Sequence, residues 1–208
     1  MQRLTFVLLT AVGVVCGFTS RAQLLSLPRS RLAMSTEPQG NQSELELFLA
    51  DRYPSFYQLV LKPNEKVVKT LRKNASFGFT LFVPNEAAFG KLGEKRINQL
   101  KDARNLETAS KISDYHTIGE ETVPLDVLLG DNIGGVLTMG GEVRVGPSQS
   151  GGFFGIGAKD DGGVVIGSNA KIVQSFQFGA GVIHEVDSLV SPEILWRYVD
   201  QLRIPGSK

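Results

Sequence analysis

The spacing of apolar residues in the first half of the chain predicts several short helices and one strand. Between residues 44 and 74, apolar side chains recur at intervals of three and four, which predicts two or three helices interrupted near Pro54 and Pro63. The stretch FGFTLFVP (77–84) alternates aromatic and aliphatic residues and stops at a proline, as a strand does. Helical spacing returns after Asn85, whose side chain is placed to cap the next helix.

The second half of the chain has the two-residue alternation of strands. Residues 134–146 form two alternating runs around Gly140-Gly141, which predicts a hairpin. The glycine-rich stretch 146–163 is predicted to be a flexible hairpin or an insertion loop. Three more strands are predicted at 164–167, 170–178 and 181–190. Because helices come first and strands follow, and because no internal repeat is present, we expect one α+β domain.

The first 34 residues differ in composition from the rest. Residues 1–17 combine a basic start with a short apolar run, which is typical of a signal peptide. Residues 18–34 are basic, rich in serine and free of acidic residues, which is typical of a transit peptide. This tandem order resembles the bipartite leader of nucleus-encoded plastid proteins in algae with secondary plastids. The alternative is a plain secretory signal followed by a basic linker.

These patterns divide the chain of 208 residues into four parts. The parts are a targeting leader (1–34), a flexible lead-in (35–43), a folded domain (44–192) and a C-terminal helix with its tail (193–208).

Composition excludes several classes of protein. The only cysteine, Cys16, lies in the leader, so the mature chain is expected to form no disulfide. The chain has 22 basic and 21 acidic residues, and four of the basic residues lie in the leader. The mature chain therefore has 18 basic and 21 acidic residues and a net charge of −3. We therefore expect no nucleic-acid partner. No span long enough to cross a membrane is expected after the leader.

The sequence predicts no catalytic, cofactor or metal site. His184, Glu185 and Asp187 lie close together, but residues on a strand alternate between two faces. Zinc needs three or four nitrogen or sulfur ligands, and the mature chain offers only two histidines and no thiolate. The segment GIGAKD (155–160) lacks the third glycine of a nucleotide-binding loop. An enzyme that uses His184 and Glu185 stays open as a further alternative.

Three stretches together resemble the fasciclin-like domain family. FTLFVPNEAAFGKL (79–92), YH (115–116) and GVIHEVDSLVSP (181–192) correspond in order to its two conserved boxes and its Tyr-His element. The resemblance covers roughly residues 50 to 192. We call the matching box positions the fold-signature residues: Thr80, Phe82, Pro84, Phe89, Gly181, His184, Asp187 and Pro192.

The resemblance implies an α+β fold in which helices pack around a wedge-shaped β-sandwich. It also implies an interaction module of the kind found in cell adhesion and extracellular matrix, with no general enzymatic activity and no cofactor.

The sequence departs from the family pattern at three places. The adhesive Asp-Ile pair of integrin-binding members is replaced by Ser175 and Phe176. Ala180 stands where the family usually has asparagine, and Glu185 stands where it usually has an apolar residue. An integrin-type site is therefore not expected, and Glu185 is the residue most particular to this chain.

Six residues are candidates for contact with a partner: Tyr115, His116, Phe153, Phe154, Glu185 and Trp196. The Tyr-His element contributes to receptor contact in adhesive relatives, although we expect Tyr115 to bury its ring and hydrogen-bond its hydroxyl. Adjacent aromatics in an extended chain point to opposite faces, so one ring of the Phe153-Phe154 pair can reach a partner. Trp196 lies in a predicted helix that either packs on its own domain or docks in a partner's groove.

Together these observations predict a non-enzymatic module for protein interaction or assembly, targeted to a plastid, with an unidentified protein partner. Peripheral association with thylakoid membrane complexes is a further expectation that rests on location alone. The alternative is a secreted or cell-surface adhesion protein. Glycans on the sequons at Asn41 and Asn74 would favour that alternative.

Overall fold

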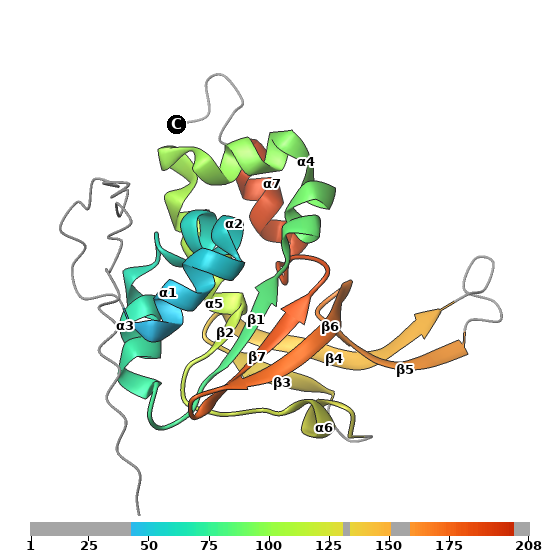
Figure 1. Ribbon diagram of the computed structural model, residues 1–208. Helices are drawn as coiled ribbons and strands as arrows, with labels where there is room; N and C mark the ends of the chain where they lie inside the picture. The colour runs from blue at the N-terminus through green and yellow to red at the C-terminus, as the bar shows by residue number, and fades with distance from the viewer. Residues whose placement is uncertain (1–42, 131–133, 151–158, 202–208) are drawn as a thin grey trace, which may run out of the picture. The chain divides into compact units, whose positions relative to one another are not determined.

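The computed structural model describes residues 43–130, 134–150 and 159–201 (Figure 1). The predicted leader, Asn41, the Phe153-Phe154 pair and the tail after Gln201 lie outside these residues. The sequon at Asn74 is described, and its side chain is buried with its amide donating a hydrogen bond to the carbonyl of Gly119. A glycan at Asn74 is therefore incompatible with the folded domain.

Helices form most of the first half, as predicted. Ser43, Asn64 and Asn85 each cap a helix by accepting a hydrogen bond from a backbone N–H of its first turn. The helical elements are α1 (Glu44–Arg52), α2 (Pro54–Phe56), a π-helical turn (Tyr57–Leu61), α3 (Glu65–Asn74), α4 (Glu86–Lys101), a 3₁₀ turn (Ala103–Asn105), α5 (Leu106–Tyr115), α6 (Leu125–Leu128) and α7 (Glu193–Gln201). None of the helices in the described part of the chain is long and apolar enough to cross a membrane.

The strands form one seven-stranded sheet in the order β2-β1-β7-β6-β5-β4-β3. They are β1 (Thr80–Pro84), β2 (Thr117–Ile118), β3 (Gly135–Thr138), β4 (Gly141–Ser150), β5 (Lys159–Ile166), β6 (Ala170–Phe178) and β7 (Gly181–Val186). Only β1 and β7 pair in parallel. A backbone hydrogen bond from Met139 to Thr117 brings the two ends of the sheet together, so the sheet is nearly closed. The α+β prediction is confirmed.

The core consists of two apolar clusters on opposite faces of the central strands. One cluster lies under the helices and takes Leu81, Val83 and Ile183 from β1 and β7. The other lies within the sheet and includes Phe82 and Val186. Alternate residues of a strand point to opposite faces, and each face of β1 is covered by one of the two clusters. All five residues of β1 are therefore buried.

The glycine-rich stretch 146–163 has strand structure at both ends. β4 continues to Ser150 and β5 begins at Lys159, where these two residues pair with each other. Figure 1 shows the two strands running side by side as a ribbon. Of the two alternatives for this stretch, the structure therefore shows a hairpin, whose connecting residues 151–158 are outside the described part.

Candidate functional site

Both histidines are fully buried and hydrogen-bonded at both ring nitrogens. His116 Nδ1 lies 2.7 Å from the carbonyl of Phe82, and His116 Nε2 accepts a hydrogen bond from the backbone N–H of Val190 at 3.0 Å. His184 Nε2 lies 2.8 Å from the carbonyl of Val123, which leaves Nδ1 to accept from the hydroxyl of Ser175 at 2.6 Å. Both imidazole rings are thus neutral. Through these hydrogen bonds each histidine joins segments that are distant in the sequence.

Burial changes the acid–base behaviour of these histidines. It lowers the pKa of His116 to about 4, and it also lowers the pKa of His184. The unfolded chain binds a proton at each histidine near pH 6.5, whereas the folded chain does not. The stabilising contribution of a neutral buried histidine is therefore complete above pH 6.5 and is lost as the pH falls towards the folded pKa.

We expect the free energy of unfolding to fall by about 2 kcal/mol for His116 between pH 7 and pH 5, with an additional decrease from His184. Denaturant titrations across this range measure the change, and carboxyl groups contribute little there because they titrate near pH 4. NMR signals of the His116 ring should show no titration above pH 5. A flat stability profile, or a histidine that titrates near pH 6.5 in the folded state, would contradict this expectation.

The side chains of the apparent cluster of His184, Glu185 and Asp187 have different partners, and the pleat of β7 turns His184 and Glu185 to opposite faces. Asp187 accepts a hydrogen bond from the backbone N–H of Lys171 and pairs with Lys91, away from the contacts of His184. In the part of the chain that the structure describes, no three His, Cys, Asp or Glu side chains are grouped so that they could hold a metal ion.

Glu185 is bound within the domain by three residues. Its carboxylate accepts hydrogen bonds from the hydroxyl of Tyr53 at 2.7 Å and from the amide of Asn85 at 3.2 Å. The guanidinium of Arg52 lies 3.7 Å away. Burial, and then the hydrogen bond to Glu185, raise the pKa of Tyr53. Glu185 therefore ties the α1–α2 junction and the cap of α4 to the central strand pair.

Two further fold-signature residues, Thr80 and Phe82, also make contacts within the domain. The hydroxyl of Thr80 accepts from the backbone N–H of Val123 and donates to the carbonyl of Glu121. Phe82 stacks on the His184 ring with centroids 5.5 Å apart. Ser175, in one of the two slots of the missing adhesive pair, is the hydrogen-bond partner of His184. Thr80, Phe82 and His184 therefore join the central strands to neighbouring segments of the domain.

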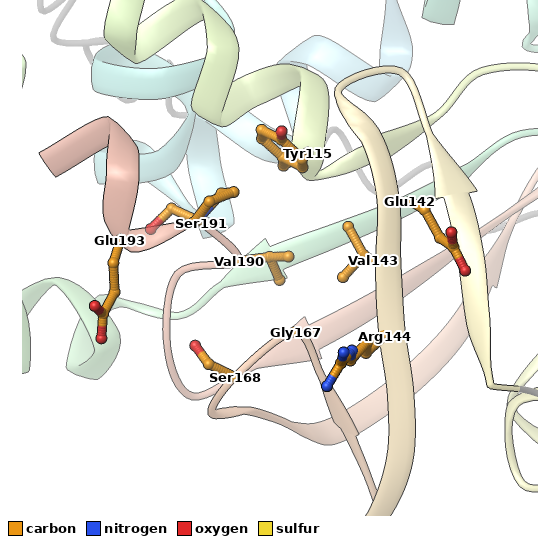
Figure 2. A pocket seen from close by; sticks show the side chains of 10 residues that line it. Tyr115, Glu142, Val143, Arg144, Gly167, Ser168, Val190, Ser191 and Glu193 are labelled. Atoms are coloured by element: carbon orange, nitrogen blue, oxygen red, sulfur yellow. The ribbon is translucent and has the colours of Figure 1, made fainter. Parts of the chain in front are cut away.

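A pocket of about 520 Å³ lies beside the predicted Tyr-His element (Figure 2). Figure 2 shows Val143 and Val190 pointing towards each other across its floor, with Tyr115 on one side and Arg144 and Ser168 on the other. Ser191 and Glu193, at the start of α7, complete the wall. The pocket thus combines an apolar floor with a polar, charged rim.

Tyr115 is half-buried at this pocket, in contrast to the expectation of a hydrogen-bonded buried ring. Its ring packs so closely on the β3–β4 turn that a Cβ at Gly140 would lie 2.8 Å from it. Among the described residues, its hydroxyl has no hydrogen-bond partner. The reason is that Tyr115 ends α5 at the rim of the pocket, where one side of the ring faces solvent.

A second pocket of about 260 Å³ adjoins the first and contains Trp196. Ser168, Ser191 and Glu193 line both pockets, so we treat the two as one surface and call it the Tyr115–Trp196 groove. The Trp196 ring is partly exposed and donates a hydrogen bond to Ser191 at 2.9 Å. The guanidinium of Arg96 lies 4.9 Å from its centroid.

Of the four predicted partner residues that the structure describes, it brings two together. Tyr115 and Trp196 line the groove, whereas His116 is buried and Glu185 is engaged within the domain. Leu195 and Val199 of α7 are buried, which shows that the helix packs on its own domain.

Sequence reasoning missed Arg144, Ser168 and Glu193. They line the first pocket at a hairpin strand, a tight turn and a helix start, and no local pattern indicates that these three places adjoin.

Comparison with known proteins agrees with the fold-signature residues. Residues 51–192 match the family model described as Fasciclin domain, which confirms the resemblance. Among solved structures, a FAS1 domain pair from the insect cell adhesion molecule fasciclin I matches with 19% identity and a TM-score of 0.48. The match covers 66% of this chain and 44% of that chain, so this chain spans less than half of it. Comparison with curated proteins gives no significant match.

Proposed function

Because this chain belongs to the Fasciclin domain family, we propose that it is a non-enzymatic protein-interaction or assembly module that binds its partner in the Tyr115–Trp196 groove. The observation that supports this proposal is the placement of two partly exposed aromatic side chains in one continuous groove. Tyrosine, tryptophan and arginine are the residues most enriched at binding hot spots. The groove offers Tyr115 and Trp196 as anchors, with Arg144 at its rim.

The groove has the polar rim that a protein interface needs. The hydroxyl of Tyr115 has no hydrogen-bond partner within the described ranges and can serve a partner protein, and Arg144, Ser168 and Glu193 are exposed. The apolar floor at Val143 and Val190 suits an aliphatic side chain of a partner. The proposal of a non-enzymatic role is supported by the two histidines, whose ring nitrogens are occupied by structural hydrogen bonds.

We expect a photo-reactive amino acid placed at Ser168 to crosslink to a specific partner in the native cell. Ser168 is exposed and lines both pockets, so a probe there faces whatever occupies the groove. Mass spectrometry of the crosslinked species identifies the product. The matched control places the same probe at Gln177, which is exposed on β6 and lines neither pocket.

A crosslink from position 168 that is absent from position 177, and that is reduced by Tyr115→Ala, supports the groove as the binding site. Equal crosslinking from both positions, or from neither, contradicts the proposal.

Delivery to a plastid is the second part of the proposal. It is supported by the composition of residues 1–34, which is basic, serine-rich and free of acidic residues in its second half. A fluorescent fusion of residues 1–40 tests it in an alga with a secondary plastid. Fluorescence in the secretory route alone would favour the secreted alternative. A glycan at Asn74 cannot serve as a second test of that alternative, because the side chain is buried in the folded chain. Association with thylakoid complexes remains a proposal that follows from this location.

A further inference from the structure

One face of α3 carries a row of exposed lysines. Lys66, Lys69 and Lys73 follow one another at intervals of three and four residues, which places them on the same side of the helix. The opposite side of α3 packs into the core through Val67 and Leu71. All three lysines are exposed. We call this row the α3 lysine face.

Most of the positive charge on this face is not neutralised by neighbours. Lys69 pairs with Glu65, but Lys66 and Lys73 have no ion-pair partner among the described residues. Lys62 lines the same cavity of about 330 Å³ as Lys69, and it likewise has no ion-pair partner in the described part of the chain. The α3 lysine face therefore presents a local excess of positive charge on a domain whose overall balance is acidic.

An exposed phenylalanine lies in the turn that follows α3 in the sequence. Phe77 lies in the turn between α3 and β1, four residues after Lys73, and its side chain is 85% exposed. It is the most exposed large hydrophobic residue in the described part of the chain. Phe79, two residues later, is buried in the core, whereas Phe77 is exposed to solvent. Nothing within the fold explains an apolar ring at this position.

We propose that the α3 lysine face and Phe77 form a site for peripheral binding to an anionic lipid bilayer. Lysines close to such a surface are attracted to the negative headgroups, and an exposed aromatic ring inserts at the boundary of headgroups and acyl chains. The lysines run along the helix and Phe77 follows four residues after the last of them, so the proposal requires both to contact one bilayer surface.

A bilayer fits these observations better than an acidic protein does. Phe77 lines neither pocket of the groove, nor the cavity beside Lys62, nor the pocket at Leu128 and Val164. A bilayer needs no preformed groove, because lipid closes around the inserted ring. Glu120 and Glu121 are exposed in the loop that follows β2, close to the end of α3, where Gly119 accepts a hydrogen bond from Asn74. Their repulsion from an anionic surface opposes contact at this end of the helix, so binding depends on the attraction of the lysines along the side of α3.

Vesicle sedimentation tests the proposal on residues 40–208, which form a compact unit with their own core. The protein should bind vesicles that contain phosphatidylglycerol, bind pure phosphatidylcholine weakly, and dissociate as ionic strength rises. The pair Lys66→Gln and Lys73→Gln should weaken binding by about 25-fold, because each lysine near an anionic surface contributes about fivefold. Phe77→Ser should weaken it by at least about fivefold through loss of apolar contact.

The matched control removes two lysines from α4, Lys95→Gln and Lys101→Gln, and should leave binding nearly unchanged. All of these side chains are exposed, so each variant is expected to fold, which circular dichroism checks. No preference for anionic over neutral vesicles, or an equal loss in the α4 control, would overturn the proposal. Loss of binding in the α3 lysine variant without any change in Phe77→Ser would overturn the bilayer assignment and indicate a purely electrostatic contact with an acidic partner.

Discussion

Replacing Gly181 with alanine is expected to lower the free energy of unfolding by about 3 kcal/mol. A Cβ atom at this position would lie 2.4 Å from the ring of Phe79, and that ring is itself buried in the core. Two atoms cannot approach this closely, so either the ring or the start of β7 must move. Overpacking a filled core costs about 1–3 kcal/mol, and the severity of this contact places Gly181→Ala at the upper end. Denaturant titration measures the loss as a lower midpoint with an unchanged slope.

The same substitution at Gly90 is the matched control and is expected to have the opposite sign. Gly90 lies within α4, and no atom stands within 4 Å of the position that its Cβ would take. Alanine is favoured over glycine inside a helix by about 1 kcal/mol, so Gly90→Ala should stabilise the domain. If the two variants shift stability equally, the packing explanation for the fold-signature glycine is wrong.

Glu185→Ala is expected to lower the free energy of unfolding by about 2–3 kcal/mol, although the family usually has an apolar residue at this position. The substitution removes the acceptor for the hydroxyl of Tyr53 and for the amide of Asn85. Tyr53 is 2% exposed, so its hydroxyl has little access to water as a replacement. A buried donor left without a partner costs about 1–3 kcal/mol. Glu94→Ala, at an exposed position of α4, should change stability by less than about 0.5 kcal/mol.

A double-mutant cycle with Tyr53→Phe isolates the hydrogen bond itself. Because both side chains belong to one network, their effects should be non-additive by about 1–2 kcal/mol. Additivity would mean that Tyr53 and Glu185 do not interact. The carboxylate of Glu185 would then be a candidate for contact with a partner again. The predicted role of Glu185 in partner binding stays a prediction, but the hydrogen bonds already account for its charge at this position.

Local patterns predicted the elements that depend on local chemistry. The strand before Pro84 and the cap at Asn85 follow from residues within a few positions of one another, and both are present in the structure. Strand alternation also argued against a catalytic cluster at His184, and in the structure both ring nitrogens of His184 are engaged, by Ser175 and by the carbonyl of Val123. Such features need no knowledge of the tertiary arrangement.

The groove and the Glu185 network could not be predicted in this way, because they depend on contacts between distant segments. Asn85 and Glu185 are 100 positions apart, and Tyr53 is farther still from Glu185. Ser168 reaches the groove only because the β5–β6 turn lies against the segment that leads into α7. The spacing of the lysines on α3 can be recognised in the sequence, but the exposure of Phe77 beside them is known only from the structure.

The parallel pairing of β1 with β7 has a consequence for the order of events during synthesis. β1 is made early, yet five of its residues pair with β7 and only two pair with β2. A nascent chain that ends before Gly181 therefore lacks the main partner of its central strand. Pairing between such distant segments is slow, because a long loop must close before any contact is gained. The centre of the sheet thus forms only when nearly the whole domain has been made.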